Sequence, residues 1–502
     1  MAHIFCKLED MMKENHKIYG ITQDVKTEQY MIVLDYYYDK RNEEYGICEQ
    51  CKRNITNPVW CQSCDPSKES TRNSPLNDND EINNCIKSFQ FKAVEYDNFI
   101  EWIQYNDLAE TIKKIEWIPM DGKSLQEIEE KSEQLDFFMA SWNIRKIENE
   151  PGVYMRSRSE SRVDLIKLLN SQATRCGFYK ERGFGTVYSA IWLDGKRTVE
   201  KVDDCYKRSR RLPYVVALKT FPGSKTDVSS VLKEFKSHMK CRLEGAELEM
   251  YGLTQNTKNN DYLMVFQYAN KGNLRKFLRE NFNELTWQKK LQQLEYMSND
   301  LHQIHNAKFT HCDFYSGNIL LNQNLDGKIK SYIADLGLSR KIGDDSEDEV
   351  HGVMQYVAPE VLLGKQPSEK ADIYGFSVIM AEVAGISPFD GHEVNTKLAV
   401  KICNGSQPEF APKTPDCYIE WAHKCMDQDP ANRPSALVIN ENINDWLKKL
   451  ASDDENEIKK QFLSADETIK KLSIVPQICS HHTKKINKQE ILKGIYLRNY
   501  LK

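Results

Sequence analysis

The chain lacks any apolar run that could cross a membrane. None of its 502 residues fall in an apolar stretch near the roughly 18–20 residues that a bilayer span requires. We also expect no secretory leader, because the N-terminus turns acidic at Glu9 and Asp10 before an apolar segment can form. We therefore expect an intracellular, cytoplasmic protein with no membrane span.

The chain also has no excess of positive charge. Lys and Arg total 69 against 74 Asp and Glu, which gives a net charge of −5 and argues against a generally basic nucleic-acid binder. In a reducing compartment, the 14 cysteines are not expected to form a disulfide framework. The apolar share of 40% is typical of a globular protein, and the length suggests about three units.

Local composition divides the chain unevenly. Residues 72–84 are rich in Asn, Asp, Ser and Pro and are interpreted as a linker, while 150–162 alternate Arg with Ser and suggest exposed chain. Between them, 96–148 carries helical spacing. From about 174, short β-branched and aromatic runs give way to long amphipathic stretches, which predicts an α+β fold with a sheet-rich lobe and a helical lobe. The polar tail 449–502 has helical spacing and suggests a docked or partly ordered extension.

Chemistry-bearing motifs lie in the α+β region. Val216-Ala-Leu-Lys219 is a buried-strand pattern that ends in a charge, and Gly183-Phe-Gly185-Thr-Val187 precedes it. His311-Cys-Asp313-Phe-Tyr-Ser-Gly-Asn318, Ala334-Asp335-Leu-Gly and Ala358-Pro-Glu360 follow in that order. Phosphoryl transfer needs a carboxylate near the attacking hydroxyl, oxygen ligands for Mg²⁺ and a cation on the phosphates. This ordered set supplies every part.

By these motifs, residues 174–448 resemble a protein-kinase domain with a bilobal fold, which implies ATP and Mg²⁺ as cofactors and a protein substrate. The resemblance gives catalytic roles to Asp313 as proton acceptor, Lys219 on the phosphates, and Asn318 and Asp335 on Mg²⁺. It further implies that Asp372 supports the catalytic loop and that Glu360 pairs with Arg433. The implied ATP-binding residues are Gly183, Gly185, Val187, Ala217, Lys219, Glu234, Phe266, Gln267, Ala269 and Leu320.

Several positions depart from the kinase pattern. Lys180 and Arg182 stand where the first two glycines of the phosphate loop are usual, which could weaken the clamp. Cys312 replaces the arginine that receives an activation-loop phosphate in many kinases. Tyr315 and Val353 match neither the serine/threonine nor the tyrosine pattern. The acidic run Asp344–Glu349 is either a standing mimic of phosphorylation or a solvated loop.

A second signal is a pair of Cys-x-x-Cys motifs at Cys48, Cys51, Cys61 and Cys64. Four thiolates at this spacing can hold one tetrahedral Zn²⁺ in a closed, structural site. Redox pairs and unpaired thiols are the alternatives. More narrowly, a Cys-x-x-Cys…Trp-Cys-x-x-Cys segment, the Ile-Glu-Trp-Ile-Pro sequence at 115–119 and the tail at 461–466 resemble a fungal family of tyrosine-kinase-like enzymes.

A third signal is internal repetition. The stretch 19–36 matches 251–268 at a constant offset of 232 residues. In the kinase resemblance, this stretch is the strand pair that leads into the hinge. We interpret residues 1–40 as a partial kinase-like fragment, either a degenerate duplicate or a sequence artefact, and expect it to be poorly packed unless it docks elsewhere.

The predicted organisation is a kinase-like fragment at 1–40, a zinc segment at 41–68, a linker and helical extension at 69–173, the kinase domain at 174–448 and a tail at 449–502. The leading hypothesis is a protein kinase in intracellular signalling, with serine or threonine favoured over tyrosine as acceptor. The alternatives are an ATP-binding pseudokinase scaffold and a zinc-segment adaptor. The substrate and the oligomeric state are not indicated by the sequence.

Overall fold

A computed structural model describes residues 18–23, 30–34, 41–72, 79–114, 145–146, 154–155, 186–203, 205–211, 214–324, 326–343, 351–472 and 484–485. The chain divides into two compact units. The smaller contains Met1–Leu76, Ile86–Ile100 and Arg197–Arg210, and the larger contains Asn77–Cys85, Glu101–Lys196 and Arg211–Lys502. No helix within the described ranges is both long and apolar enough to cross a bilayer.

The sheet of the larger unit has six strands in the order β3-β11-β12-β10-β7-β4. Their bounds are β3 Glu101–Trp102, β4 Leu108–Lys114, β7 Val187–Trp192, β10 Tyr214–Thr220, β11 Met250–Gln255 and β12 Tyr262–Gln267. The central strands are antiparallel, and β3 alone runs parallel to its neighbour β11. Helix α6 (Ser229–Leu243) belongs to the same lobe. Alternation of β-branched and aromatic residues explains the buried face, where Val216, Leu218 and Val265 meet Trp192.

Two of these strands differ from the sequence expectation. We expected residues 69–173 to be a linker and a helical extension, but β3 and β4 come from this range and complete the sheet. Beyond residue 114, nearly all of the helical spacing expected at 96–148 lies outside the described residues. Strand β4 pairs with β7 across a long sequence separation, with Leu108 opposite Trp192. Sequence periodicity does not reveal such a pairing, because a two-residue strand and an isolated edge strand carry little pattern of their own.

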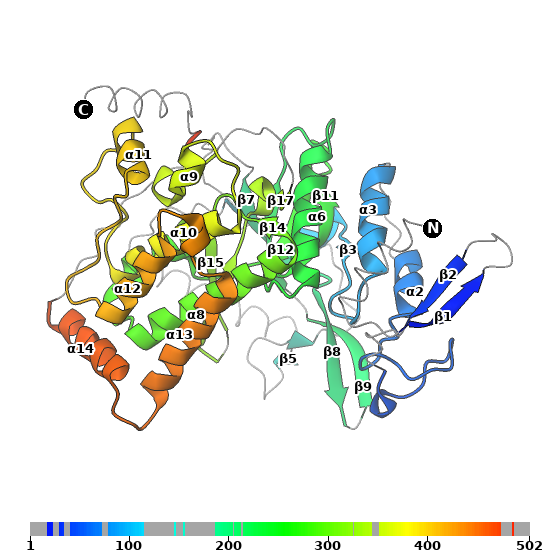
Figure 1. Cartoon of the computed structure of the whole chain (residues 1–502). Coiled ribbons are helices and arrows are strands. Elements are labelled where there is room, and N and C mark those ends of the chain that lie inside the picture. The colour runs from blue at the N-terminus through cyan, green and yellow to red at the C-terminus, as the bar shows by residue number, and fades with distance from the viewer. Residues whose placement is uncertain are drawn as a thin grey trace. The chain divides into compact units, whose positions relative to one another are not determined.

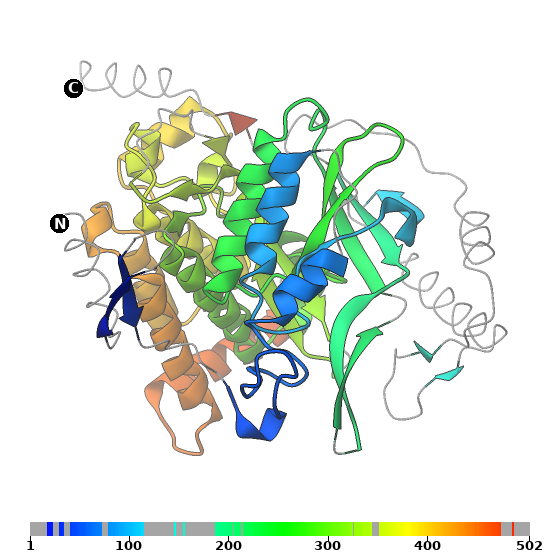
Figure 2. The ribbon, with the colours of Figure 1, turned by 90° about the vertical axis from the view of Figure 1, so that its right-hand side faces the viewer.

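The helical lobe is built around α8 (Trp287–Asn306) and α10 (Glu369–Ala384). Helix α10 is apolar on most sides and is buried along nearly its whole length, as expected for a central helix. The other helices are α7 Leu274–Asn281, α9 Pro359–Leu362, α11 Thr396–Cys403, α12 Asp416–Cys425, α13 Ala436–Ala451 and α14 Glu457–Leu472. Helices α8 and α13 lie side by side (Figures 1 and 2).

The tail helix α14 packs on this lobe. Phe462 is fully buried against Trp287 and Trp446, and the backbone N–H of Trp287 donates to Asp466 Oδ1 at 2.8 Å. Through residue 468, the tail is therefore a docked extension, one of the two alternatives expected.

The smaller unit has its own aromatic core. Trp60, Tyr96 and Phe99 pack together with Ala93, and Trp60 Nε1 donates to the carbonyl of Ala93. Its elements include α2 (Asp65–Arg72), part of α3 (Asp80–Gln90), and nearly all of the hairpin formed by β8 (Lys196–Val202) and β9 (Cys205–Arg211). Trp60 thus packs in a core. The basic run 207–211 forms most of strand β9.

The N-terminal repeat forms a hairpin of β1 (Ile18–Gln23) and β2 (Tyr30–Leu34). Gly20 pairs with Val33, and in β11 and β12 Gly252 pairs with Val265. Each pairing is the other shifted by 232 residues, and the register irregularity recurs at the same place. The sequence repeat therefore extends to local structure.

Candidate functional site

The centre of the site is an ion cluster around Lys219, the predicted strand lysine. Lys219 lies on β10 and donates to Glu234 Oε1 on α6 at 2.7 Å and to Asp335 Oδ1 at 2.8 Å. Burial disfavours its ammonium, but the two carboxylates outweigh this effect and raise the pKa of Lys219. Burial likewise opposes ionisation of Asp335, yet Lys219 holds its pKa below the usual value. The cluster thus sets one lysine against two carboxyl groups.

The loop before β15 (Ile319–Gln323) carries the predicted proton acceptor. Asn318 Nδ2 donates to the carbonyl of Asp313 at 2.9 Å and to its Oδ2 at 3.1 Å, which fixes the carboxylate. Asp313 Oδ1 is buried and has no hydrogen-bond partner among the described residues. Burial, together with the charge of Asp335, raises the pKa of Asp313 to about 7. A carboxylate with this pKa and an unused oxygen is suited to accept a proton near neutral pH.

Asp372 on α10 anchors the same loop through hydrogen bonds to its backbone. Its carboxylate accepts from the backbone N–H of His311 at 2.8 Å and of Cys312 at 3.2 Å, and it contacts His305 Nε2 at 3.0 Å. Cys312 adopts a left-handed backbone with φ 67°, which is unusual for a residue with a side chain. These two bonds stabilise that conformation, in agreement with the support role implied for Asp372.

Asn318 and Asp335 present the donor types that Mg²⁺ prefers. Asn318 uses its amide nitrogen on Asp313, so its amide oxygen is the atom left for a metal. Asp335 has φ 63°, and its Oδ1 also accepts from the N–H of Gly337. A side chain at Gly337 would come within 2.9 Å of Glu234 Oε2, so a bulkier residue would disturb the cluster. The residues present therefore fit a magnesium site.

The predicted adenine side is formed by β10, β12 and β15. Ala217 lies opposite Phe266 in the sheet, and Ala217 and Leu320 are both partly exposed. Phe266 is buried and has its ring 5.0 Å from that of His238 on α6. The N–H of Gln267 donates to the carbonyl of Glu249. Val187 begins β7, opposite Lys219. Gly183, Gly185, Lys180 and Arg182 lie outside the described residues.

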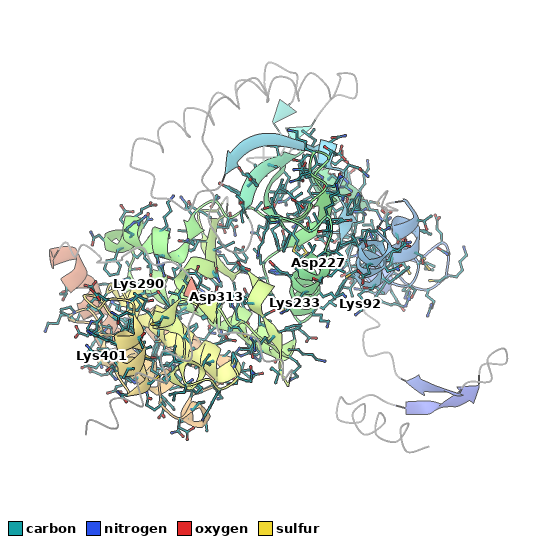
Figure 3. The ribbon with its side chains drawn as sticks, turned by 90° about the horizontal axis from the view of Figure 1, so that it is seen from above. Lys92, Asp227, Lys233, Lys290, Asp313 and Lys401 are labelled. Carbon is teal, nitrogen blue, oxygen red and sulfur yellow. The ribbon has the colours of Figure 1, made fainter. Side chains whose placement is uncertain are left out.

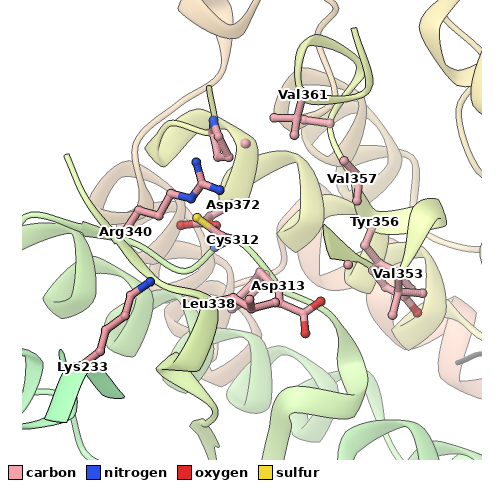
Figure 4. Close-up of a pocket in the computed structure, with 15 residues that line it drawn as sticks. Lys233, Cys312, Asp313, Leu338, Arg340, Val353, Tyr356, Val357, Val361 and Asp372 are labelled. Carbon is pink, nitrogen blue, oxygen red and sulfur yellow. Dashed lines mark hydrogen bonds between the residues drawn. The ribbon is translucent and has the colours of Figure 1, made fainter. Parts of the chain in front are cut away.

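A cavity of about 360 Å³ opens beside Asp313 (Figure 4). Its lining includes Lys233, Cys312, Asp313, Arg340, Val353 and Tyr356. The side chains of Cys312 and Arg340 lie together near Asp372, and Lys233 approaches from α6. Burial raises the pKa of the Cys312 thiol, so it is a neutral group at the position where an arginine was expected. The acidic run at 344–349 lies outside the described residues.

Sequence reasoning did not find the surroundings of Tyr315. Its ring lies 5.5 Å from the guanidinium of Arg275 and 5.9 Å from the ring of Tyr356. Arg275 pairs with Glu382 at 3.5 Å, and the Tyr356 hydroxyl donates to Glu382 at 2.7 Å. This aromatic and charged cluster comes from four segments far apart in sequence, so no local motif predicts it. Glu360 and Arg433, by contrast, form the predicted pair, with two bonds of 2.8 Å.

The four predicted zinc ligands form a cluster in the smaller unit. The sulfur atoms of Cys48, Cys51, Cys61 and Cys64 all lie within 4.8 Å of one another, and none is in a disulfide. Cys51 and Cys61 have their sulfurs 3.7 Å apart, close to the edge of about 3.8 Å of a tetrahedron with Zn–S bonds of about 2.3 Å. Both spacing and donor chemistry fit a structural zinc site.

Comparison with known proteins agrees with this geometry. The profile of a family described as protein tyrosine and serine/threonine kinase matches residues 181–443. The chain is 29% identical over 276 residues to MDIS1-interacting receptor like kinase 2 of Arabidopsis thaliana, which is 51% of this chain and 24% of that protein.

It is also 26% identical over 323 residues to a probable leucine-rich-repeat receptor-like serine/threonine-protein kinase of the same plant, which covers 60% of this chain and 33% of the relative. It is 27% identical over 194 residues to the probable serine/threonine-protein kinase roco5 of Dictyostelium discoideum, or 36% and 7% of the two chains. The chain thus spans a third or less of these curated relatives. Because the profile covers more than half of its residues, the chain belongs to the protein tyrosine and serine/threonine kinase family.

Proposed function

We propose that the chain is an active ATP-dependent protein kinase that transfers the γ-phosphate to a protein hydroxyl, with serine or threonine as the favoured acceptor. The observation that carries this is the assembled set of Lys219–Glu234, Asp335 and a buried Asp313 with an unused oxygen. A scaffold without catalysis has no need to keep this set intact. The curated relatives, two of them described as serine/threonine kinases, support the acceptor class.

In this mechanism, Lys219 binds phosphate oxygens and Glu234 holds the lysine on the correct side of β10. Asp313 Oδ1 accepts the proton of the substrate hydroxyl while Asn318 keeps Oδ2 in place. Asn318 and Asp335 would hold Mg²⁺, which neutralises developing charge on the phosphates when it is bound. The cavity beside Asp313 gives the acceptor side chain access.

The test compares phosphate transfer to a generic protein substrate by the wild type and by Asp313→Asn. Removing the proton acceptor should lower the rate about 10²–10⁴-fold while leaving ATP binding nearly unchanged. Melting curves with and without Mg-ATP check the binding, and Lys448→Ala, which alters an exposed lysine on α13 outside the cavity, is the control. Equal transfer by the wild type and Asp313→Asn would reject the assignment, and ATP binding with no wild-type transfer would favour the pseudokinase.

We also propose that the four cysteines hold one structural Zn²⁺. Their convergence in a single cluster supports a shared metal over two separate redox pairs. Elemental analysis should find about one zinc per chain, and Cys48→Ser should lose it, whereas Cys205→Ser, at an exposed cysteine outside the cluster, should retain it. A wild type without zinc would refute the site. A cytoplasmic location and membership of the fungal tyrosine-kinase-like group remain proposals, the latter supported by the cysteine segment ahead of the kinase region.

A further inference from the structure

The β8–β9 hairpin stands, in sequence, between β7 and β10 of the large sheet, yet Arg197–Arg210 belong to the unit that contains the cysteine cluster. Each strand directs one arginine into that unit. Arg197 of β8 is almost fully buried, and Arg208 of β9 is about three-quarters buried. Buried arginines require partners, because an uncompensated charge away from water is costly.

Arg208 contacts the cysteine segment through its whole guanidinium. Its Nε and Nη2 donate to the carbonyl of Val59 at 3.0 and 2.7 Å, and Nη2 pairs with Asp65 Oδ2 at 3.0 Å. The plane also lies near the ring of Trp60. Val59 has φ 58°, a left-handed conformation that a β-branched residue rarely adopts. The forked bond to its carbonyl helps to hold this turn, which leads directly into Cys61.

Asp65 joins Arg208 to the cluster. The oxygen that pairs with Arg208, Oδ2, also accepts from the backbone N–H of Cys61 at 2.6 Å. Asp65 directly follows Cys64 and begins α2. One carboxylate oxygen thus fixes the backbone of the second Cys-x-x-Cys turn, and the hairpin arginine fixes that carboxylate. Groups in this position orient the ligands of a metal without touching it.

Arg197 provides a second attachment, independent of the cysteines. Its Nη1 donates to Glu69 Oε2 at 2.9 Å, and its guanidinium lies 4.8 Å from the rings of Tyr96 and of Phe99. Glu69 lies on α2, one turn after Asp65, and its other oxygen contacts Arg208 at 3.2 Å. Helix α2 is therefore held by one arginine from each strand of the hairpin.

We propose that Arg208 and Asp65 are positioning residues of the four-cysteine site, so that zinc binding and the ordering of the β8–β9 hairpin are linked. This inference rests on the proposed zinc site and goes beyond it by assigning residues outside the ligand set. Linkage is reciprocal: the factor by which the docked hairpin tightens zinc binding equals the factor by which zinc favours the docked hairpin. Because β10 with Lys219 begins soon after Arg211, the chain itself connects this hairpin to the catalytic strand.

The first experiment measures zinc affinity of the full-length protein by competition with a colorimetric chelator. Arg208→Ala and Asp65→Ala should each weaken zinc binding about 10–100-fold. Arg208→Lys keeps the charge but cannot make the paired hydrogen bonds to the carbonyl of Val59. Its zinc affinity should lie between that of Arg208→Ala and that of the wild type. Lys207→Ala, an exposed neighbour on the same strand, should bind zinc as tightly as the wild type. If Arg208→Ala lowers the melting temperature equally with and without zinc and leaves the zinc affinity unchanged, Arg208 is merely structural and the inference fails.

The second experiment follows hydrogen exchange of the amides in 196–211 with zinc and after its removal. Zinc removal should accelerate their exchange in the wild type, and this difference should shrink in Arg208→Ala. Exchange that is indifferent to zinc would overturn the linkage. If the wild type binds no zinc at all, the zinc site itself is overturned as well. If the wild type binds zinc and the Arg208→Ala variant binds it with equal affinity, only the role of Arg208 is overturned.

Discussion

At the residue scale, the shape of the catalytic loop depends on Tyr315, which lies two positions after the proton acceptor Asp313. Tyr315 turns its ring onto Arg275 and Tyr356, and this ring covers Gly317. A methyl group at 317 would come within 2.3 Å of the tyrosine ring. Tyrosine at 315 and glycine at 317 therefore depend on each other, and both flank the loop that positions Asn318.

Gly317→Ala should displace the Tyr315 ring and destabilise the protein by about 1–3 kcal/mol, the usual cost of overpacking. Phosphate transfer should fall with it, because Asn318 is the next residue. Thermal denaturation and transfer assays measure the two effects. The double variant Gly317→Ala, Tyr315→Ala should recover part of the lost stability, and a single variant as stable as the wild type would contradict the predicted clash.

The sequence predicted Lys219, Glu234, Asp313, Asn318 and Asp335 as one set because their spacings are local motifs or reproduce a known order. The structure brings these five together, although their catalytic roles remain predictions. The cluster around Tyr315 could not be predicted from the sequence, because Arg275 and Glu382 lie on two separate helices. Phosphate-loop residues 183 and 185 lie outside the described residues, so their placement stays a prediction.

At the scale of elements, the tail helix α14 covers an unusual residue of α8. Lys290 is almost fully buried, and its Nζ has no hydrogen-bond partner among the described residues (Figure 3). The ammonium lies 3.7 Å from the centroid of the Phe282 ring and 4.9 Å from that of Trp287. Burial lowers the pKa of Lys290 to about 7, although Asp466 of α14 opposes the shift. The native state thus binds this proton more weakly than the unfolded chain does.

Lys290→Met should therefore stabilise the protein, by about 1–4 kcal/mol below pH 7, where the buried lysine is charged. Between pH 7 and about 10, the native lysine is neutral while the unfolded one still binds a proton, so wild-type stability should rise and the advantage of Met should shrink. Melting temperatures of both proteins from pH 6 to 10 measure this. Lys289→Met, at the exposed neighbouring position, is the control; a pH-independent difference for Lys290→Met would contradict the prediction.

Helices and strands were predictable where the hydrophobic periodicity extended over the full length of the element. The sheet-then-helix order and the strand that carries Lys219 followed from periodicity, whereas the tail was expected only as a docked or partly ordered extension. Strands β3 and β4 did not, because their partners lie far along the chain and their own sequences are short or irregular. Gly252 shows how specific the β3 pairing is: a side chain there would meet the carbonyl oxygen of Glu101 at 1.8 Å. A close approach of this kind is visible only in three dimensions.

At the scale of the whole molecule, the strands of the large sheet come from two sequence segments, one before residue 115 and one after residue 186. Residues 115–186 separate β4 from its partner β7, and β3 adds to the opposite edge beside β11. Leu108 and Ile103 are buried in the same core as Trp192 and Val265. Noncovalent contacts thus hold the 101–114 segment to the remainder of the lobe.

A protease recognition sequence inserted within residues 120–140 tests this arrangement. After cleavage, the two fragments should remain associated and retain phosphate transfer, since strand pairing, the apolar core and the bonds of Arg197 and Arg208 to residues 59–69 replace the covalent connection. Gel filtration of the cleaved protein measures the association, with the uncleaved insertion variant as the control. Elution of two separate fragments would show that β3 and β4 contribute little to holding the sheet.

The pairing of Leu108 with Trp192 also has a kinetic consequence. A hairpin of neighbouring strands closes a loop of a few residues, whereas this pair closes one roughly ten times longer, at an added entropic cost of about 2 kcal/mol. Sheets made of such distant pairs form slowly. Folding of the sheet should therefore wait for β4 to pair, and until it does the edge of β7 stays open to other chains.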